Sequence, residues 1–406
     1  MVRHLYKIFR EKERLEFDHI FKERQNYESL MKLPFKIKPL DQPENFTLYY
    51  IPTQNIIELI VKIYKQDNQL LKLSSELPSI AKKNLILELL VDELHNTNDL
   101  EGVRSTKEEI IRSAREVEAS PDKKTNHRFS SMVSTYYNLL RDEKVVINEP
   151  RDIREIYDDI TEDEIEKNEI PDGKMFRVDT TYVYKKSGSG KVIHRGITPE
   201  DKIIEAIEQL INFMNEGDFP FLIKIAVGHY YFGYIHPFYD GNGRTSRFIS
   251  SLYLNNECSE LTALSLSRGC NNFRSKYLHS FEIANSFANR GEMNNFIENF
   301  LAIISETQQE MILQVKEKVH LFDNLWEILD SDHRLDERCK GIMFILAQNY
   351  YFALDEKGLT VRELAEITKK SSQYIRSILK ELGNYDIISQ RGERPIIYSI
   401  SEKYFD

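Results

Sequence analysis

The 406-residue sequence predicts a mainly α-helical protein with one small β-hairpin and a C-terminal winged helix-turn-helix domain. Three observations predict this fold class. Apolar residues recur at helical spacing along most of the chain. Two short strand signals surround a glycine turn inside this helical region, at residues 180–195. Near the C-terminus, three short helix signals precede a strand–turn–strand pattern, which is the element order of a winged helix-turn-helix.

Composition excludes several classes of protein. Hydrophobic residues make up 41% of the chain, enough for a substantial core. The net charge of −10 argues against general nucleic-acid binding, although one basic face remains compatible with it. The three cysteines lack metal-type spacing and are expected to be reduced. No apolar run reaches membrane-spanning length, and the N-terminus lacks the apolar segment of a signal peptide. We therefore expect a cytoplasmic protein without membrane contact; export by a route without a cleaved signal stays open.

The first 315 residues divide into two predicted regions. Residues 1–78 are mixed and partly helical, with a helix over 54–71 and no long helix at 33–40, where Pro39 interferes. Residues 79–315 form the predicted main domain. It opens with a helix over 79–101 that Gly102 ends. Further helices are predicted at 105–119, 126–141, 198–215, 219–234, 244–255, 276–288 and 293–313.

The remaining chain comprises a predicted linker at 316–335 and the predicted winged helix-turn-helix domain at 336–406. Its helices are expected at 340–348, 361–367 and 372–382, followed by two strands within 387–398. Basic residues accompany the last helix and the hairpin: Lys369, Lys370, Arg376, Lys380, Arg391 and Arg394. Domains of this kind often bind DNA, and many others dock proteins or dimerise, so both interpretations stay open.

A dense polar motif interrupts the apolar helix signal at residues 236–247. Gly241, Asn242 and Gly243 stand at the start of the next helix, where free backbone N–H groups and the helix dipole favour an anion. Arg244 and Arg247 are three residues apart and project from one side of the first turn, and guanidinium groups suit phosphate oxygens.

Two further residues of the motif carry chemistry. Asp240 is a hard oxygen donor that can hold a Mg²⁺ ion bridging two phosphates. His236 can take a proton from an attacking hydroxyl. Each residue alone has an ordinary structural explanation, a core histidine, a turn or a helix cap. Their joint occurrence favours phosphoryl-type transfer, which depends mainly on positioning and charge stabilisation.

The segment from His236 to Arg247 resembles the defining motif of the Fic family, His-x-Phe-x-(Asp/Glu)-Gly-Asn-Gly-Arg-x-x-Arg, at every position. The resemblance covers about residues 80–310 and implies a Fic-type helical bundle. It implies a protein adenylyltransferase that moves AMP from ATP to Ser, Thr or Tyr hydroxyls of target proteins and of itself. By this resemblance His236 is the general base and Asp240 holds Mg²⁺. The resemblance also implies that Gly241, Asn242 and Gly243 form the anion hole and that Arg244 and Arg247 bind the β- and γ-phosphates of ATP.

The end of the helix at 79–101 resembles the inhibitory motif of the same family, with Thr97, Glu101 and Gly102 matching. A glutamate at a helix C-terminus is disfavoured by the dipole and calls for a cationic partner. The resemblance implies that Glu101 pairs with Arg247 and prevents productive binding of the ATP γ-phosphate. A solvated glutamate at a helix end is the alternative.

Two more parts of the site follow from the resemblance. The hairpin resembles the flap that holds a target segment by strand pairing, through Thr181, Tyr182, Val183, Tyr184, Val192 and Ile193. A plain connector is its alternative. Tyr277 and Asn285 resemble adenine-pocket positions, although ordinary helix packing explains Tyr277 equally well.

Other functions stay open at this point. The same fold can remove AMP or transfer a phosphate or another nucleotide. The chain could also be a DNA-binding regulator with a nucleotide-sensing domain, which would contact DNA through the winged helix. The protein target is not indicated by the sequence, and a homo-oligomer remains compatible with it.

Overall fold

The computed structural model describes residues 3–119, 127–140, 146–162, 164–185, 190–354 and 357–404. The chain forms two compact units, one of residues 1–68 and 90–309 and the other of residues 69–89 and 310–406. The chain passes between them three times, each time within a helix: α3 (Gln54–Glu76), α4 (Ser79–Glu101) and α14 (Asn294–Ser331). The fold is mainly helical with small antiparallel sheets, which confirms the predicted fold class.

The first unit begins with α1 (Leu5–Glu11) and α2 (Arg14–Gln25), followed by a hairpin that the sequence analysis missed. Its strands β1 (Met31–Ile37) and β2 (Phe46–Tyr50) pair antiparallel. Buried and exposed side chains alternate along β1, as expected for a strand with one covered face. Phe35 stacks on Tyr231 of the central helix with ring centroids 3.9 Å apart. This hairpin therefore packs on the helical core.

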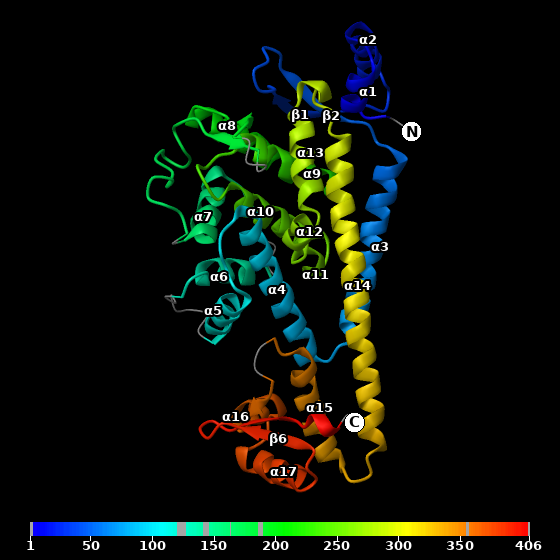
Figure 1. Ribbon diagram of the computed structural model, residues 1–406, viewed down its shortest axis with the longest axis vertical. Coiled ribbons are helices and arrows are strands. Elements are labelled where there is room, and N and C mark those ends of the chain that lie inside the picture. The colour runs from blue at the N-terminus through cyan, green and yellow to red at the C-terminus, as the bar shows by residue number, and fades with distance from the viewer. Residues whose placement is uncertain are drawn as a thin grey trace. The chain divides into compact units, whose positions relative to one another are not determined.

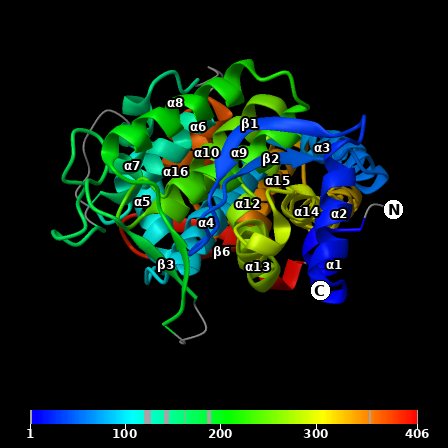
Figure 2. The same ribbon diagram turned by 90° about the horizontal axis from the view of Figure 1, so that it is seen from above.

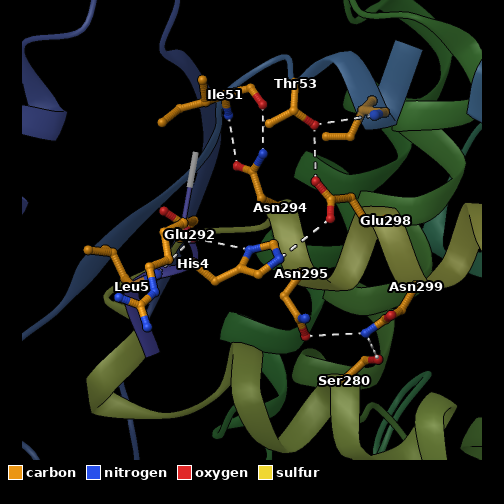
Figure 3. A network of polar contacts seen from close by, with 12 residues as sticks. His4, Leu5, Ile51, Thr53, Ser280, Glu292, Asn294, Asn295, Glu298 and Asn299 are labelled. Carbon is orange, nitrogen blue, oxygen red and sulfur yellow. Dashed lines mark hydrogen bonds and ion pairs between the residues drawn. The ribbon is translucent and has the colours of Figure 1, made fainter. Parts of the chain in front are cut away.

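A polar network ties the N-terminal segment to the start of α14 (Figure 3). His4 lies between two carboxylates, with Nδ1 3.7 Å from Glu292 Oε1 and Nε2 3.5 Å from Glu298 Oε2. Burial alone would lower the pKa of His4, but the two glutamates outweigh it and raise this pKa to about 9. Asn294 accepts a hydrogen bond from the Ile51 amide (2.9 Å) and donates to its carbonyl (2.6 Å). The two glutamates thus keep the His4 imidazole protonated at neutral pH.

The helical body of the first unit surrounds the apolar helix α9 (Phe221–Ile235), which is buried along nearly its whole length. A helix that is apolar all round is expected in a protein interior. It packs against α8 (Glu200–Glu216) and α10 (Asn242–Glu257). The other elements of this body are α5 (Lys107–Ala119), α6 (Ser130–Leu139), α7 (Pro150–Thr161), β3 (Tyr182–Tyr184), β4 (Val192–Arg195), α11 (Glu260–Ala263), α12 (Leu266–Asn272), α13 (Arg274–Ala284) and the 3₁₀ turn η1 (Phe287–Asn289).

Three of these helices were not predicted, namely α7, α11 and α12. The segment before Glu162 carried a signal for α7, because Pro150 opens the helix and Glu149 and Asp152 form a reciprocal capping box. The helix predicted from residue 198 begins later, at Glu200, because Pro199 is the capping residue and not the first helical one. The predicted hairpin is present as β3 and β4, which pair antiparallel, and Figure 2 shows it projecting from the helices around it.

The second unit contains the C-terminal elements. These are α15 (Glu337–Phe352), β5 (Leu359–Thr360), α16 (Val361–Thr368), α17 (Ser372–Asn384), β6 (Ile388–Arg391), β7 (Ile397–Ile400) and the short turn η2 (Glu402–Tyr404). The strands form a three-stranded antiparallel sheet in the order β5-β7-β6. Helix α14 continues to Ser331, so most of the predicted linker at 316–335 is helical. The winged helix-turn-helix assignment remains a prediction that this element order supports.

None of the helices in the described part of the chain is both long and apolar enough to cross a membrane. The three cysteines are free thiols, and burial raises the pKa of each to about 12.

Candidate active site

The motif at residues 236–247 forms a short loop between α9 and α10. Helix α9 ends because His236 adopts a left-handed backbone conformation (φ 51°), and α10 begins after Gly241, which is also left-handed (φ 77°). A Cβ atom on Gly241 would lie 2.7 Å from Thr161 Cγ2, so only glycine fits there. Asn242 closes the loop, because its side chain accepts from the Phe238 amide (2.9 Å) and donates to the Phe238 carbonyl (2.8 Å).

His236 is half-buried at the start of this loop. Burial, together with the nearby side chains of His194 and Arg177, lowers the pKa of its imidazole to about 3. The ring is therefore neutral at physiological pH. A neutral imidazole is the form that can accept a proton.

Arg177 holds the backbone of His236 in place, and the sequence analysis did not find this residue. Its buried guanidinium donates to the carbonyls of four residues: His236 (2.9 Å), Asp179 (2.6 Å), Ile197 (2.7 Å) and Ile235 (3.4 Å). Burial lowers the pKa of Arg177 to about 10. The residue joins both ends of the hairpin to the loop. No local pattern signals it, because all four acceptors are backbone atoms.

Arg244, in the first turn of α10, is fully buried and has no hydrogen-bond acceptor among the described residues. Its nearest opposite charge is Asp240, whose Oδ2 lies 3.5 Å from Arg244 Nη2. Buried cationic groups are normally hydrogen-bonded, and one without an acceptor is costly. An anion bound at the start of α10 would supply the missing acceptors, which makes a phosphate the group that fits here.

Asp240 has a side chain that is 42% exposed, so one face of its carboxylate is open to a ligand. Within the described ranges, no three His, Cys, Asp or Glu side chains are grouped to form a metal site. A Mg²⁺ ion held mainly by phosphate oxygens needs only one or two protein carboxylates. Asp240 fits that arrangement.

Arg247 is buried like Arg244, but it is fully engaged by α4. Its guanidinium donates to Thr97 Oγ1 (2.9 Å), to the Thr97 carbonyl (3.1 Å) and to Glu101 Oε1 (2.8 Å). Burial alone would lower the pKa of Arg247, but the Glu101 carboxylate outweighs it and the pKa is raised. The structure thus brings Thr97 and Glu101 to the motif, 150 and 146 residues from their partner.

The Glu101 carboxylate also occupies the space next to the glycine turn. A Cβ atom on Gly243 would lie 2.0 Å from Glu101 Oε1, so the carboxylate rests almost on the backbone at the start of α10. Gly102 ends α4 in a left-handed conformation (φ 81°), with the Val103 amide bonded to the Asn98 carbonyl (2.9 Å). This is the Schellman arrangement, and it fixes the direction in which Glu101 leaves the helix.

A second buried carboxylate secures the same face of α4, two turns before Glu101. Glu93 accepts from the Ser267 amide (2.7 Å) and from the Ser267 hydroxyl (2.6 Å). Burial raises the pKa of Glu93 to about 7. The sequence analysis did not find this contact either.

The hairpin β3–β4 stands beside the loop. Val183 pairs with His194 and Tyr182 with Arg195, while Tyr182 and Tyr184 expose 43% and 55% of their surface. His194 points inward and its Nε2 lies 2.6 Å from the Tyr234 carbonyl. The turn of the predicted flap, at 186–189, lies outside the described residues. Thr181, Val192 and Ile193 are partly buried at the hairpin, and their role toward a target stays a prediction.

Tyr277 and Asn285 lie in α13 and at its C-terminal end. The Tyr277 hydroxyl lies 2.7 Å from His229 Nε2, and Asn285 Oδ1 accepts from the Tyr230 hydroxyl (2.7 Å). Both polar groups therefore have partners inside the protein. The adenine-binding role of both residues stays a prediction. Tyr277 is buried, so this geometry does not favour that role for it.

The loop thus combines two buried arginines at the start of a helix, a histidine of lowered pKa and a neighbouring hairpin. The model of the Fic/DOC family matches residues 148–254. Among solved structures, a Fic family protein from Desulfovibrio desulfuricans G20 is 16% identical, with a TM-score of 0.51, and the match covers 87% of this chain and 98% of that one.

Two further structures match less closely. A Fic domain-containing signalling protein from Bacteroides thetaiotaomicron is 18% identical, with a TM-score of 0.41 and coverage of 65% of this chain and 97% of that one. Fic-1 from C. elegans is 17% identical, with a TM-score of 0.42 and coverage of 65% and 75%. Residues 148–254 therefore carry a Fic domain. Fic domain proteins commonly transfer AMP or other nucleotide groups onto proteins.

Proposed function

We propose that this protein is an adenylyltransferase that moves AMP from ATP to a Ser, Thr or Tyr hydroxyl of a target protein and of itself, and that Glu101 holds it in a low-activity state. The observation that carries the proposal is the pair of buried arginines at the start of α10. Arg244 has no acceptor in the described part of the chain, whereas Arg247 is bound by Thr97 and Glu101. A triphosphate would satisfy the first and must displace Glu101 from the second.

The chemistry uses the neutral His236. The target hydroxyl loses its proton to the imidazole while its oxygen attacks the α-phosphorus of ATP. The bond between this phosphorus and the oxygen that bridges to the β-phosphate breaks, and pyrophosphate leaves. A pKa of about 3 makes His236 a weak base in the free protein. The negative charge of a bound triphosphate raises the pKa of a neighbouring imidazole, and so strengthens the base when substrate is present.

The loop residues position the triphosphate. The backbone N–H groups at Gly241–Gly243 and the dipole of α10 favour its negative charge. Arg244 and Arg247 donate to phosphate oxygens once Arg247 is released. Asp240 would hold Mg²⁺, which when bound neutralises phosphate charge and polarises the phosphorus.

Glu101 opposes this binding in two ways. It neutralises Arg247, and its carboxylate fills the space beside Gly243 where a phosphate oxygen would approach the backbone. Two anions cannot share this space without strong repulsion. Release therefore requires that the Glu101 carboxylate leave Arg247, by a movement of its side chain or of the end of α4.

The hairpin would present the target. Its exposed tyrosines and the strand edge beside them suit pairing with an extended segment that places a hydroxyl near His236. The identity of the target protein stays open, because pairing through main-chain atoms depends little on the side chains of the target segment.

The test is intact-mass spectrometry of the Glu101→Gly variant after incubation with Mg²⁺ and ATP. We expect a mass increase of one AMP per modified site, and no increase for Glu101→Gly combined with His236→Ala. The double variant should still bind ATP in calorimetry, because the phosphate contacts remain. An adduct with the mass of phosphate, or transfer that persists without His236, would contradict the proposal.

A further inference from the structure

We propose that the outer face of α17, together with the turn between β6 and β7, binds duplex DNA. This inference concerns the second unit and does not depend on the transfer reaction. It begins from a difference in charge. The whole chain carries a net charge of −10, and residues 336–406 are neutral, with eleven Lys and Arg against eleven Asp and Glu. Within this neutral region, residues 367–380 contain four Lys and Arg and no Asp or Glu. A local concentration of positive charge in an acidic protein indicates an anionic partner for that surface.

Helix α17 has one apolar and one polar face. Ile375, Ile378, Leu379 and Leu382 are buried in the unit. The opposite face exposes Gln373, Arg376, Ser377 and Lys380. This face holds no carboxylate over Ser372–Lys380, and among the described residues neither Arg376 nor Lys380 forms an ion pair. Glu381, the first acidic residue of the helix, lies 3.6 Å from Arg338 of α15.

The neighbouring helix α16 shows the opposite arrangement. Arg362 pairs with Glu366 (3.0 Å), and Glu363 is used in the capping box with Thr360. Its charges are therefore satisfied within the helix. Helix α16 packs against α17, and the two are joined by Lys369, Lys370 and Ser371, with Ser371 capping α17 through the Tyr374 amide (3.2 Å). Two packed helices with a short connection that present the second helix outward form the geometry of a helix-turn-helix.

The β6–β7 turn adds a second contact region. Arg391 pairs across the hairpin with Ile397, and the turn at 392–396 is exposed and carries Arg394. Strand β6 packs against α17, so these arginines belong to the same part of the unit as the helix (Figure 1).

The side chains suit DNA in chemical type. The major groove accepts an α-helix, and Gln and Arg are donors that read base edges there. Lys380, Lys369 and Lys370 are suited to phosphates, which position a protein without reading sequence. A protein partner would be expected to meet a more apolar surface, and the exposed face of α17 offers only polar side chains. The observations therefore favour duplex DNA over a protein partner.

The experiment measures fluorescence anisotropy of a labelled 30-base-pair duplex of mixed sequence with the full-length protein, at 50 and 200 mM salt. We expect saturable binding with a dissociation constant in the micromolar range at low salt, weakening steeply at high salt. The Arg376→Ala/Lys380→Ala variant should bind at least about tenfold more weakly and show a shallower salt dependence.

The matched control is Arg334→Ala/Lys340→Ala, which removes two positive charges that already have carboxylate partners away from α17. It should bind the duplex within about twofold of the unaltered protein, and both variants should keep the unaltered melting temperature within a few degrees. Absence of saturable duplex binding at 50 mM salt, or an equal loss in both variants, would overturn the proposal. So would self-association, measured by sedimentation, that requires Arg376 and Lys380 while DNA does not bind.

Discussion

The two arginines in the first turn of α10 differ in one respect. Arg244 and Arg247 are both buried, three residues apart on one helix. Arg247 donates to Thr97 and Glu101 at the end of α4, whereas Arg244 has only Asp240 at 3.5 Å and no hydrogen bond within the described residues. An anion could therefore bind Arg244 directly, whereas at Arg247 it would have to displace a carboxylate of the protein itself. The proposed binding of phosphate and its proposed control thus depend on different contacts.

The largest expected effect is on the free energy of unfolding when each of the two arginines is replaced in turn. Arg247→Met removes the guanidinium that donates to the Glu101 carboxylate and to the Thr97 carbonyl, so we expect it to lower the free energy of unfolding by about 2–4 kcal/mol. Arg244→Met removes a buried charge without an acceptor, so stability should stay equal or rise. Urea unfolding of both variants, with ATP absent, gives the measurement. Equal destabilisation by the two substitutions would show that Arg244, like Arg247, forms stabilising contacts in the absence of a ligand.

The second prediction concerns Arg177 and the loop that carries His236. Arg177 acts through the backbone that it holds and is a positioning residue for His236. Arg177→Lys, which can replace only part of its hydrogen bonds, should lower kcat by about 10- to 100-fold while the Kd for ATP stays unchanged. Arg154→Lys, at an arginine on α7 paired with Asp158, is the control. A fall in ATP affinity with kcat intact would contradict the positioning role.

The smallest expected effect is the pH dependence of the free energy of unfolding. The pKa values of His194, His229 and His236 are lowered to about 4, 3 and 3. As the pH falls below 6.5, the unfolded chain takes up protons that the folded protein refuses, so stability falls. Glu93, with its pKa raised to about 7, acts in the opposite sense between pH 4.5 and 7. His4, with its pKa raised to about 9, acts in the same sense as Glu93 over this range. The three histidines outweigh these two groups, and we expect the free energy of unfolding to be about 1 kcal/mol lower at pH 5.5 than at pH 7.

His4 provides the internal control for this pH dependence. Its pKa is raised to about 9, so the stability that it contributes is fully present below pH 6.5 and is lost as the pH rises through 9. His4→Gln should flatten the stability profile above about pH 6.5 and leave its course below that pH unchanged. A profile that rises from pH 7 to pH 5.5 would show that the buried histidines are not neutral.

Much of the site could be predicted from sequence because its residues are contiguous. The residues from His236 to Arg247 share one loop and one helical turn, so their spacing alone places them together. Helix α4 was predicted with its observed bounds, since apolar spacing and Gly102 mark both its course and its end. The meeting of Glu101 with Arg247 followed from a family resemblance, because no local pattern specifies a contact across 146 residues.

Other contacts left no trace in the sequence. Arg177 binds backbone carbonyls from three separate segments, and a carbonyl has no residue identity to detect. The β1–β2 hairpin was missed because Pro34 lies inside β1 and argues against a strand, although the alternation of Leu33, Phe35 and Ile37 was a usable signal. Tyr277 resembles a ligand-binding position, but only the fold places its hydroxyl on His229.

The central claim is that Glu101 holds the transferase in a low-activity state through Arg247. The direct test compares the rate of AMP incorporation from α-labelled ATP for the unaltered protein, Glu101→Gln and Asp92→Asn, the last being a carboxylate on the same helix that pairs with Lys107 instead. We expect a rate at least about tenfold higher for Glu101→Gln and an unchanged rate for Asp92→Asn. An unchanged or lower rate for Glu101→Gln, with ATP still bound, would contradict it.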